Sequence, residues 1–194
     1  MSRSALALSA ALLGALLAAV FARNAGADEL FLTEAQAPVA LFGSGMIGEA
    51  GELRLSEAEL HQLSQAVGRR VEQRDYRYLA IRAQADGGQG MVVGVILMLE
   101  VVGQTLPITF AVGVRADQTL QDVQVMVYRE PYGKEINERR FRVQFKGKAA
   151  RDPLMVEKDI AAVSGATISS RSATYAARKG LALAGILWSR GAHP

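Results

Sequence analysis

The alternation of polar and apolar residues predicts a β-sheet in the middle of the chain. Between residues 76 and 129, four segments alternate or are almost wholly apolar, and short polar turns separate them. Short turns between consecutive strands favour antiparallel neighbours, so the pattern predicts an antiparallel meander. The expected strands cover residues 76–84, 91–100, 105–115 and 120–129.

Two capping-box patterns predict helices before this sheet. Thr33 and Gln36 precede an apolar stretch that Pro38 restricts to one or two turns. Ser56 and Glu59 begin a second helix, which ends at Gly68. Residues 130–159 have mixed polarity and predict mainly loops.

A long helix is expected from about residue 169 to 189, because apolar residues recur there at helical spacing. Leu183 and Ile186 add a second apolar side to this helix. Burial under a loop and docking of a membrane partner both explain that side. The predicted fold class is α+β, with an antiparallel sheet packed against helices and a long C-terminal helix.

The first 27 residues indicate export. An uncharged run rich in Ala and Leu follows Arg3, and Ala25-Gly26-Ala27 has the pattern of a signal-peptidase site. We expect residues 1–27 to be a signal peptide, or an uncleaved anchor because the run is nearly long enough to span a membrane. Residues 28–194 then form one periplasmic domain. Loss of Arg3 and Arg23 lowers the formal net charge of +3 by two, which argues against a nucleic-acid partner.

The chain offers few groups for metal or thiol chemistry. It has no Cys and two His residues. His61 and His193 have no partner at metal-ligand spacing, so we expect both at the surface and predict no metal site. No positioned acid–base set for a substrate is visible, and we therefore predict no catalytic residues.

The segment Ser-Gly-Ala-Thr-Ile-Ser-Ser, residues 164–170, carries the most specific chemistry. A helix N-terminus exposes unpaired N–H groups with partial positive charge, which suits a phosphate group. A plain N-cap by one of the serines explains the same residues and stays open. No Walker lysine is present. The candidate phosphate-binding residues are Ser164, Gly165, Ala166, Thr167, Ser169 and Ser170.

Ser164-Gly165-Ala166-Thr167 resembles the flavinylation motif of the FMN-binding domain family. That family includes the C subunit of the sodium-pumping NADH:quinone reductase, the G subunit of the Rnf complex and part of a nitrous-oxide regulator protein. Residues 128–136, 144–148 and 159–160 also resemble small single-domain members. The resemblance covers about residues 75 to 185. It implies FMN as the cofactor and a flavin transferase that esterifies the FMN phosphate to Thr167.

The resemblance also implies roles for three residues after the last strand. Tyr132 would stack on the isoalloxazine, Glu135 would bond ribityl or ring atoms, and Glu130 would join the site. A solvated turn is the alternative. Many family members place an Asp three residues before the motif's Ser, where this chain has Ala161. Non-covalent FMN at the same place is therefore a second possibility.

We expect an exported electron carrier that exchanges electrons with a membrane oxidoreductase. The family suggests a haem-containing, ferric-reductase-like protein as that partner. The lack of an acid–base set favours a carrier over an enzyme with its own substrate, since the flavin supplies the redox chemistry. Two alternatives stay open, a non-redox phosphate- or anion-binding module and a structural accessory subunit of a membrane complex.

Overall fold

The computed structural model describes residues 28–85 and 88–191. The segment expected to be a leader or anchor lies outside these residues. Six strands form one antiparallel sheet in the order β1-β6-β5-β4-β3-β2. The strands are β1 (Glu29–Leu30), β2 (Met46–Arg54), β3 (Asp75–Ala85), β4 (Gly88–Val102), β5 (Pro107–Arg115) and β6 (Leu120–Tyr128).

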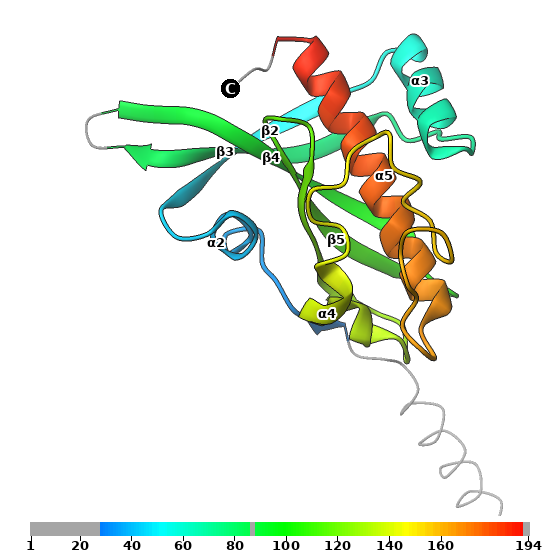
Figure 1. Cartoon of the computed structure of the whole chain (residues 1–194). Coiled ribbons are helices and arrows are strands. Elements are labelled where there is room, and N and C mark those ends of the chain that lie inside the picture. Colours follow the sequence, from blue (N-terminus) through cyan, green and yellow to red (C-terminus); the bar gives the residue numbers. More distant parts are fainter. Residues whose placement is uncertain (1–27, 86–87, 192–194) are drawn as a thin grey trace, which may run out of the picture.

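Helices cover both faces of this sheet. Helix α5 (Thr167–Ser189) crosses one face, with α3 (Glu57–Val67) beside its C-terminal part, and α2 (Ala37–Phe42) lies on the other face (Figure 1). Two apolar cores result, a large one under α3 and α5 and a smaller one under α2. The α+β class and the antiparallel meander β3–β6 are confirmed.

The two expected N-terminal helices form where the capping boxes indicated. Ser56 and Glu59 make a complete capping box at α3, and Gly68 ends that helix in the left-handed conformation. The helix α2 begins later than its capping pattern suggested, at Ala37. There the Gln36 side chain reaches back to accept a hydrogen bond from Thr33 N–H, while Pro38 occupies the first turn.

Strand β2 was not predicted. It contains Gly48 and Gly51, and in the sheet both glycines are needed for packing. A Cβ at Gly51 would come 2.4 Å from Cζ of Tyr78, and one at Gly48 would come 2.9 Å from Cγ of Pro38. The absence of a side chain at each glycine therefore lets neighbouring side chains cross β2. The strand conformation itself is stabilised by the pairing of β2 with β3.

Helix α5 packs closely on the sheet. A Cβ at Gly180 would lie 2.5 Å from Cγ1 of Val112 on β5, so the absence of a side chain lets the helix approach the strand closely. Leu183 and Ile186 are both buried in the large core. The interpretation of this second apolar side as a docking surface is therefore wrong. It is covered within the domain itself.

The chain between β6 and α5 runs over the same face as α5. It contains a short 3-10 helix, η1 (Lys134–Asn137), and one turn of α-helix, α4 (Arg139–Arg142). Phe141 and Phe145 of this segment are both buried in the large core, and their rings contact each other edge to face with centroids 5.4 Å apart. This segment is what positions the start of α5. No helix in the described residues is both long and apolar enough to cross a membrane.

Candidate functional site

A tight turn precedes α5 at the predicted motif. Ala166 N–H donates to the carbonyl of Val163 at 2.9 Å, which closes a β-turn with Ser164 and Gly165 at its centre. Gly165 has φ +77°, which a type II turn requires at its third residue. A Cβ at Gly165 would meet nothing within 4 Å. The turn therefore needs this glycine for its backbone conformation and not for space.

The N-terminus of α5 carries no side-chain cap. Its N-cap residue is Ala166, and the helix begins at Thr167, two residues earlier than expected. Among the described residues, the N–H groups of Thr167, Ile168 and Ser169 have no hydrogen-bond acceptor. The side chain of Thr167 is exposed and no acidic residue lies in the first turn. The helix end can therefore receive an anion through three N–H donors and its partial positive charge.

No serine of the motif caps the helix through its side chain, as the alternative required. Ser170 is fully buried, and its hydroxyl donates to the carbonyl of Ala166 and accepts from Val163 N–H. Ser169 is also buried, with its hydroxyl 2.8 Å from the Tyr128 oxygen. Both hydroxyls thus hold the helix start in place, and only the N–H group of Ser169 remains open.

Tyr128 joins the end of β6 to the start of α5. Its O–H donates to the carbonyl of Tyr132, and its oxygen pairs with the Ser169 hydroxyl. Burial raises the pKa of Tyr128, so the phenol stays protonated and can donate. Gly133, with φ +99°, fits against this pair, since a Cβ there would lie 2.6 Å from Ser169 Oγ. Nothing in the sequence indicated the part that Tyr128 plays here.

Glu130 serves the turn between β4 and β5. Its carboxylate accepts from the N–H groups of Thr105 and Leu106 at 2.6 and 2.9 Å, and from the Thr105 hydroxyl. Burial alone would raise the pKa of Glu130, but these hydrogen bonds outweigh burial and lower it. The hydrogen-bonding capacity of the carboxylate is thereby used within the β4–β5 turn. This turn places Gln104 at the edge of the site.

A cavity of about 250 Å³ lies in front of Thr167. Tyr132 lines it with a side chain that is 83% exposed, and Ile168 is exposed as well. Two exposed apolar residues adjoin it, Val102 at the end of β4 and Leu106 in the β4–β5 turn. The lining residues are Gln104, Glu130, Pro131, Tyr132, Gly165, Ala166, Thr167, Ile168 and Ser169. Gln104 and Ile168 gave no signal in the sequence.

Ser164 and Glu135 line a different cavity, of about 380 Å³. Its other walls come from α4, from Gln144 and from residues 161–163. The structure therefore brings Glu130, Tyr132 and Thr167 together, and places Glu135 on the other cavity, with Ser164. The assignment of any of these residues to a ligand stays a prediction.

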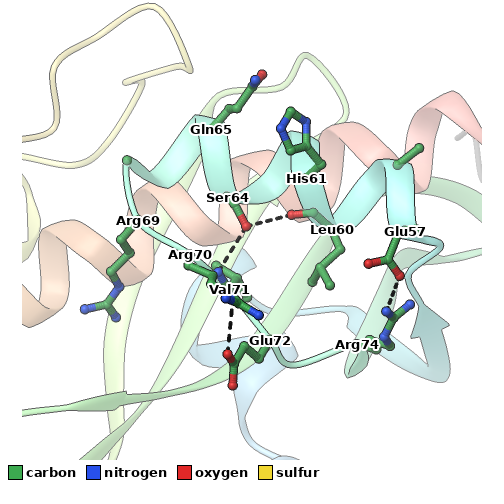
Figure 2. Close-up of a pocket in the computed structure, with 12 residues that line it drawn as sticks. Glu57, Leu60, His61, Ser64, Gln65, Arg69, Arg70, Val71, Glu72 and Arg74 are labelled. Carbon is green, nitrogen blue, oxygen red and sulfur yellow. Dashed lines mark hydrogen bonds and ion pairs between the residues drawn. The ribbon is translucent and has the colours of Figure 1, made fainter.

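The largest hollow lies elsewhere, between α3 and the chain that follows it (Figure 2). It holds none of the predicted site residues. Its charged side chains include two internal ion pairs, Arg74 with Glu57 and Arg70 with Glu72. It also contains His61, which is exposed as expected. Within residues 28–85 and 88–191, no group of three His, Cys, Asp or Glu residues could hold a metal ion.

One protein family matches the C-terminal part of the chain. Residues 103–182 match the family model of an FMN-binding domain. This range contains the β4–β5 turn, Tyr128, the Ser-Gly-Ala-Thr turn and most of α5. The search of curated proteins gives no match.

One solved structure resembles the fold. It is the C subunit of the Na(+)-translocating NADH-quinone reductase from Parabacteroides distasonis, with a TM-score of 0.47 and 19% sequence identity. The alignment covers 78% of this chain and 81% of that chain.

Proposed function

Because residues 103–182 match the family model of an FMN-binding domain, we propose that the protein is an exported flavoprotein that relays electrons, with FMN held by a phosphoester to Thr167. FMN is the cofactor of that family. The observation that carries the proposal is the exposed Thr167 at an uncapped helix N-terminus with three open N–H groups. This is the arrangement that a phosphate monoester or diester needs.

The residues around Thr167 fit both ends of FMN. The N–H groups of Thr167, Ile168 and Ser169 suit the phosphoryl oxygens. The exposed apolar surface of Tyr132 and Ile168 suits the isoalloxazine, which is flat and largely apolar. FMN supplies the electron transfer when bound, and the protein binds and orients it and tunes its potential. Glu130 contributes indirectly, because its carboxylate holds the β4–β5 turn beside the cavity.

A covalent bond to Thr167 suits an exported carrier. A small cofactor lost outside the cytoplasm is not easily replaced, and a phosphoester prevents that loss. Direct condensation of FMN with a hydroxyl would have to expel water, so the reaction needs an activated donor. We propose a flavin dinucleotide as that donor, acted on by a flavin transferase. The Thr167 oxygen forms the new P–O bond, its proton goes to a base of the transferase, and the nucleoside monophosphate leaves.

The position of the first described residues supports a membrane partner. Asp28 pairs with Arg129 and Glu29 with Lys134, so the chain enters the domain beside the end of β6 that carries Tyr128. A segment anchored in or exported through the membrane would thus hold the Thr167 end close to the bilayer. We propose that the electron partner is a membrane-bound oxidoreductase, and that a haem-containing protein fits this role because haem exchanges single electrons.

The proposal is tested by making the full chain in a host that exports it and supplies a flavin transferase. We expect the intact mass to rise by one FMN less one water, and the Thr167 peptide to carry the addition. Thr167→Ser keeps a hydroxyl and should be modified, whereas Thr167→Ala should not. Unmodified, colourless wild-type protein would contradict the proposal, as would FMN attached to the alanine variant. Thermal protection of such unmodified protein by inorganic phosphate would favour the anion-binding alternative instead.

A further inference from the structure

The chain just before the attachment turn has little backbone support of its own. Residues 161–163 belong to no strand or helix, and Ala161 and Ala162 are exposed. Apart from the turn-closing bond from Ala166 to Val163, two side chains supply the hydrogen bonds of this segment. Ser170 accepts from Val163 N–H, and Gln144 binds Ala161. The path of the chain into Thr167 therefore depends on these two side chains.

Gln144 binds both polar groups of the Ala161 backbone. Its Oε1 accepts from Ala161 N–H at 2.8 Å, and its Nε2 donates to the Ala161 carbonyl at 3.2 Å. This two-point pairing copies what a neighbouring strand would provide. The base of Gln144 is rigid, since buried Phe141 and Phe145 flank it and its Nε2 also lies 3.3 Å from the Phe141 carbonyl.

We propose that Gln144 is a positioning residue for flavin attachment at Thr167. The inference rests on the proposed function. By pairing with Ala161, the Gln144 amide holds residues 161–163 along one wall of the cavity that contains Ser164, and so fixes where the turn presents the Thr167 hydroxyl. Ser170 also holds this segment, through its hydrogen bond with Val163, but it is buried and its substitution would disturb the core. Gln144 lies at the edge of the fold and can be changed more safely.

Two substitutions separate positioning from general stability. Gln144→Met keeps the length of the side chain but removes both hydrogen bonds. Gln144→Glu, when ionised, accepts from Ala161 N–H but repels its carbonyl. When protonated, its carboxylic acid offers one O–H donor and one carbonyl acceptor, as the amide does. The glutamate variant should therefore recover function as the pH falls, which a merely structural role would not produce.

The experiment measures the rate of flavin attachment to each purified full-length protein, with a flavin transferase and a flavin dinucleotide donor, relative to wild type at the same pH. We expect Gln144→Met to be slower by about tenfold at pH 8 and at pH 5, the loss of roughly one net hydrogen bond. Gln144→Glu should be equally slow at pH 8 and recover in part at pH 5, because a carboxyl with a pKa of about 4.3 is protonated there in roughly one molecule in six. Gln65→Met, on the exposed side of α3, is the matched control and should react as wild type does.

The results distinguish this inference from the proposed function. If wild-type protein takes up flavin and Gln144→Met reacts at the same rate, only the role of Gln144 is overturned. Equal impairment of Gln144→Glu at both pH values overturns it too. If wild-type protein acquires no flavin at all, the proposed function and the inference fall together.

Discussion

Gly133 offers a quantitative test of how the site is held together. Its φ of +99° is a conformation that costs an L-residue roughly 1–2 kcal/mol. A Cβ added there would lie 2.6 Å from Ser169 Oγ and 2.8 Å from the Tyr128 oxygen, so Gly133→Ala must displace one of them. That displacement disturbs the buried hydrogen bonds of Tyr128 to Ser169 and Tyr132, each worth about 1 kcal/mol.

The expected loss follows from these contributions. Alanine also reduces the entropy of the unfolded chain, which offsets about 0.4–1 kcal/mol. We therefore expect Gly133→Ala to lower the free energy of unfolding by about 2–3 kcal/mol. Gly147 is the matched control, because its φ is +79° and a Cβ there would meet nothing within 4 Å. Gly147→Ala should cost about 1 kcal/mol or less, since it retains the conformational term and lacks the collision.

Urea unfolding measures both variants. The single tryptophan, Trp188, is 4% exposed and reports loss of the core by fluorescence. The two free energies should differ by about 2 kcal/mol, the combined worth of the two Tyr128 hydrogen bonds. If they agree within about 0.5 kcal/mol, the contact of Gly133 with Tyr128 and Ser169 carries no measurable stability, and our account of how the β6 end is joined to α5 is refuted.

Two further predictions concern pH. Hydrogen bonds from Arg190 and Ser56 lower the pKa of Glu59 to about 2, so the ionised carboxylate stabilises the fold above about pH 4.5 and this contribution is lost as the pH falls toward 2. Glu59→Gln should therefore make the free energy of unfolding depend less on pH between about 4.5 and 2. An unchanged pH dependence in the variant would contradict this. Burial, reinforced by Arg69, lowers the pKa of Lys179 to about 8, so the unfolded chain binds more protons between about pH 8 and 10.5 and stability should rise with pH there. Lys179→Met should remove that rise in thermal unfolding measured from pH 7.5 to 9.5, below the range in which tyrosines ionise, and a rise of the same size in the variant would show that Lys179 is not its source.

The elements that the sequence predicted correctly are those whose signals are local. Strands β3 to β6 alternate or are continuously apolar, and Ser56 with Glu59 marks the start of α3 within four residues. Strand β2 was not predicted, because its glycines make room for side chains that belong to other elements. Tyr78 passes over Gly51, and that contact exists only once β2 and β3 are paired.

The candidate site divides in the same way. The Ser-Gly-Ala-Thr motif could be recognised because its residues are contiguous and the turn and helix start need little else. The functions of its neighbours could not be read from their types. Glu130 looked like a ligand for a cofactor, yet its carboxylate is occupied by the N–H groups of Thr105 and Leu106. Glu135 is near Glu130 in sequence but lines another cavity.

The sequence by itself therefore determined the class of fold and the helix that bears the site, because these depend on polarity and on interactions within a few residues along the chain. The assignment of the flavin to Thr167 came from the resemblance of the motif to a known family. Only the tertiary structure decided which hydroxyls and N–H groups remain open at that residue. Tyr128 meets Ser169 across 41 positions and Gln144 meets Ala161 across 17. Such contacts arise only when α5 and the segment between β6 and α5 have packed on the sheet.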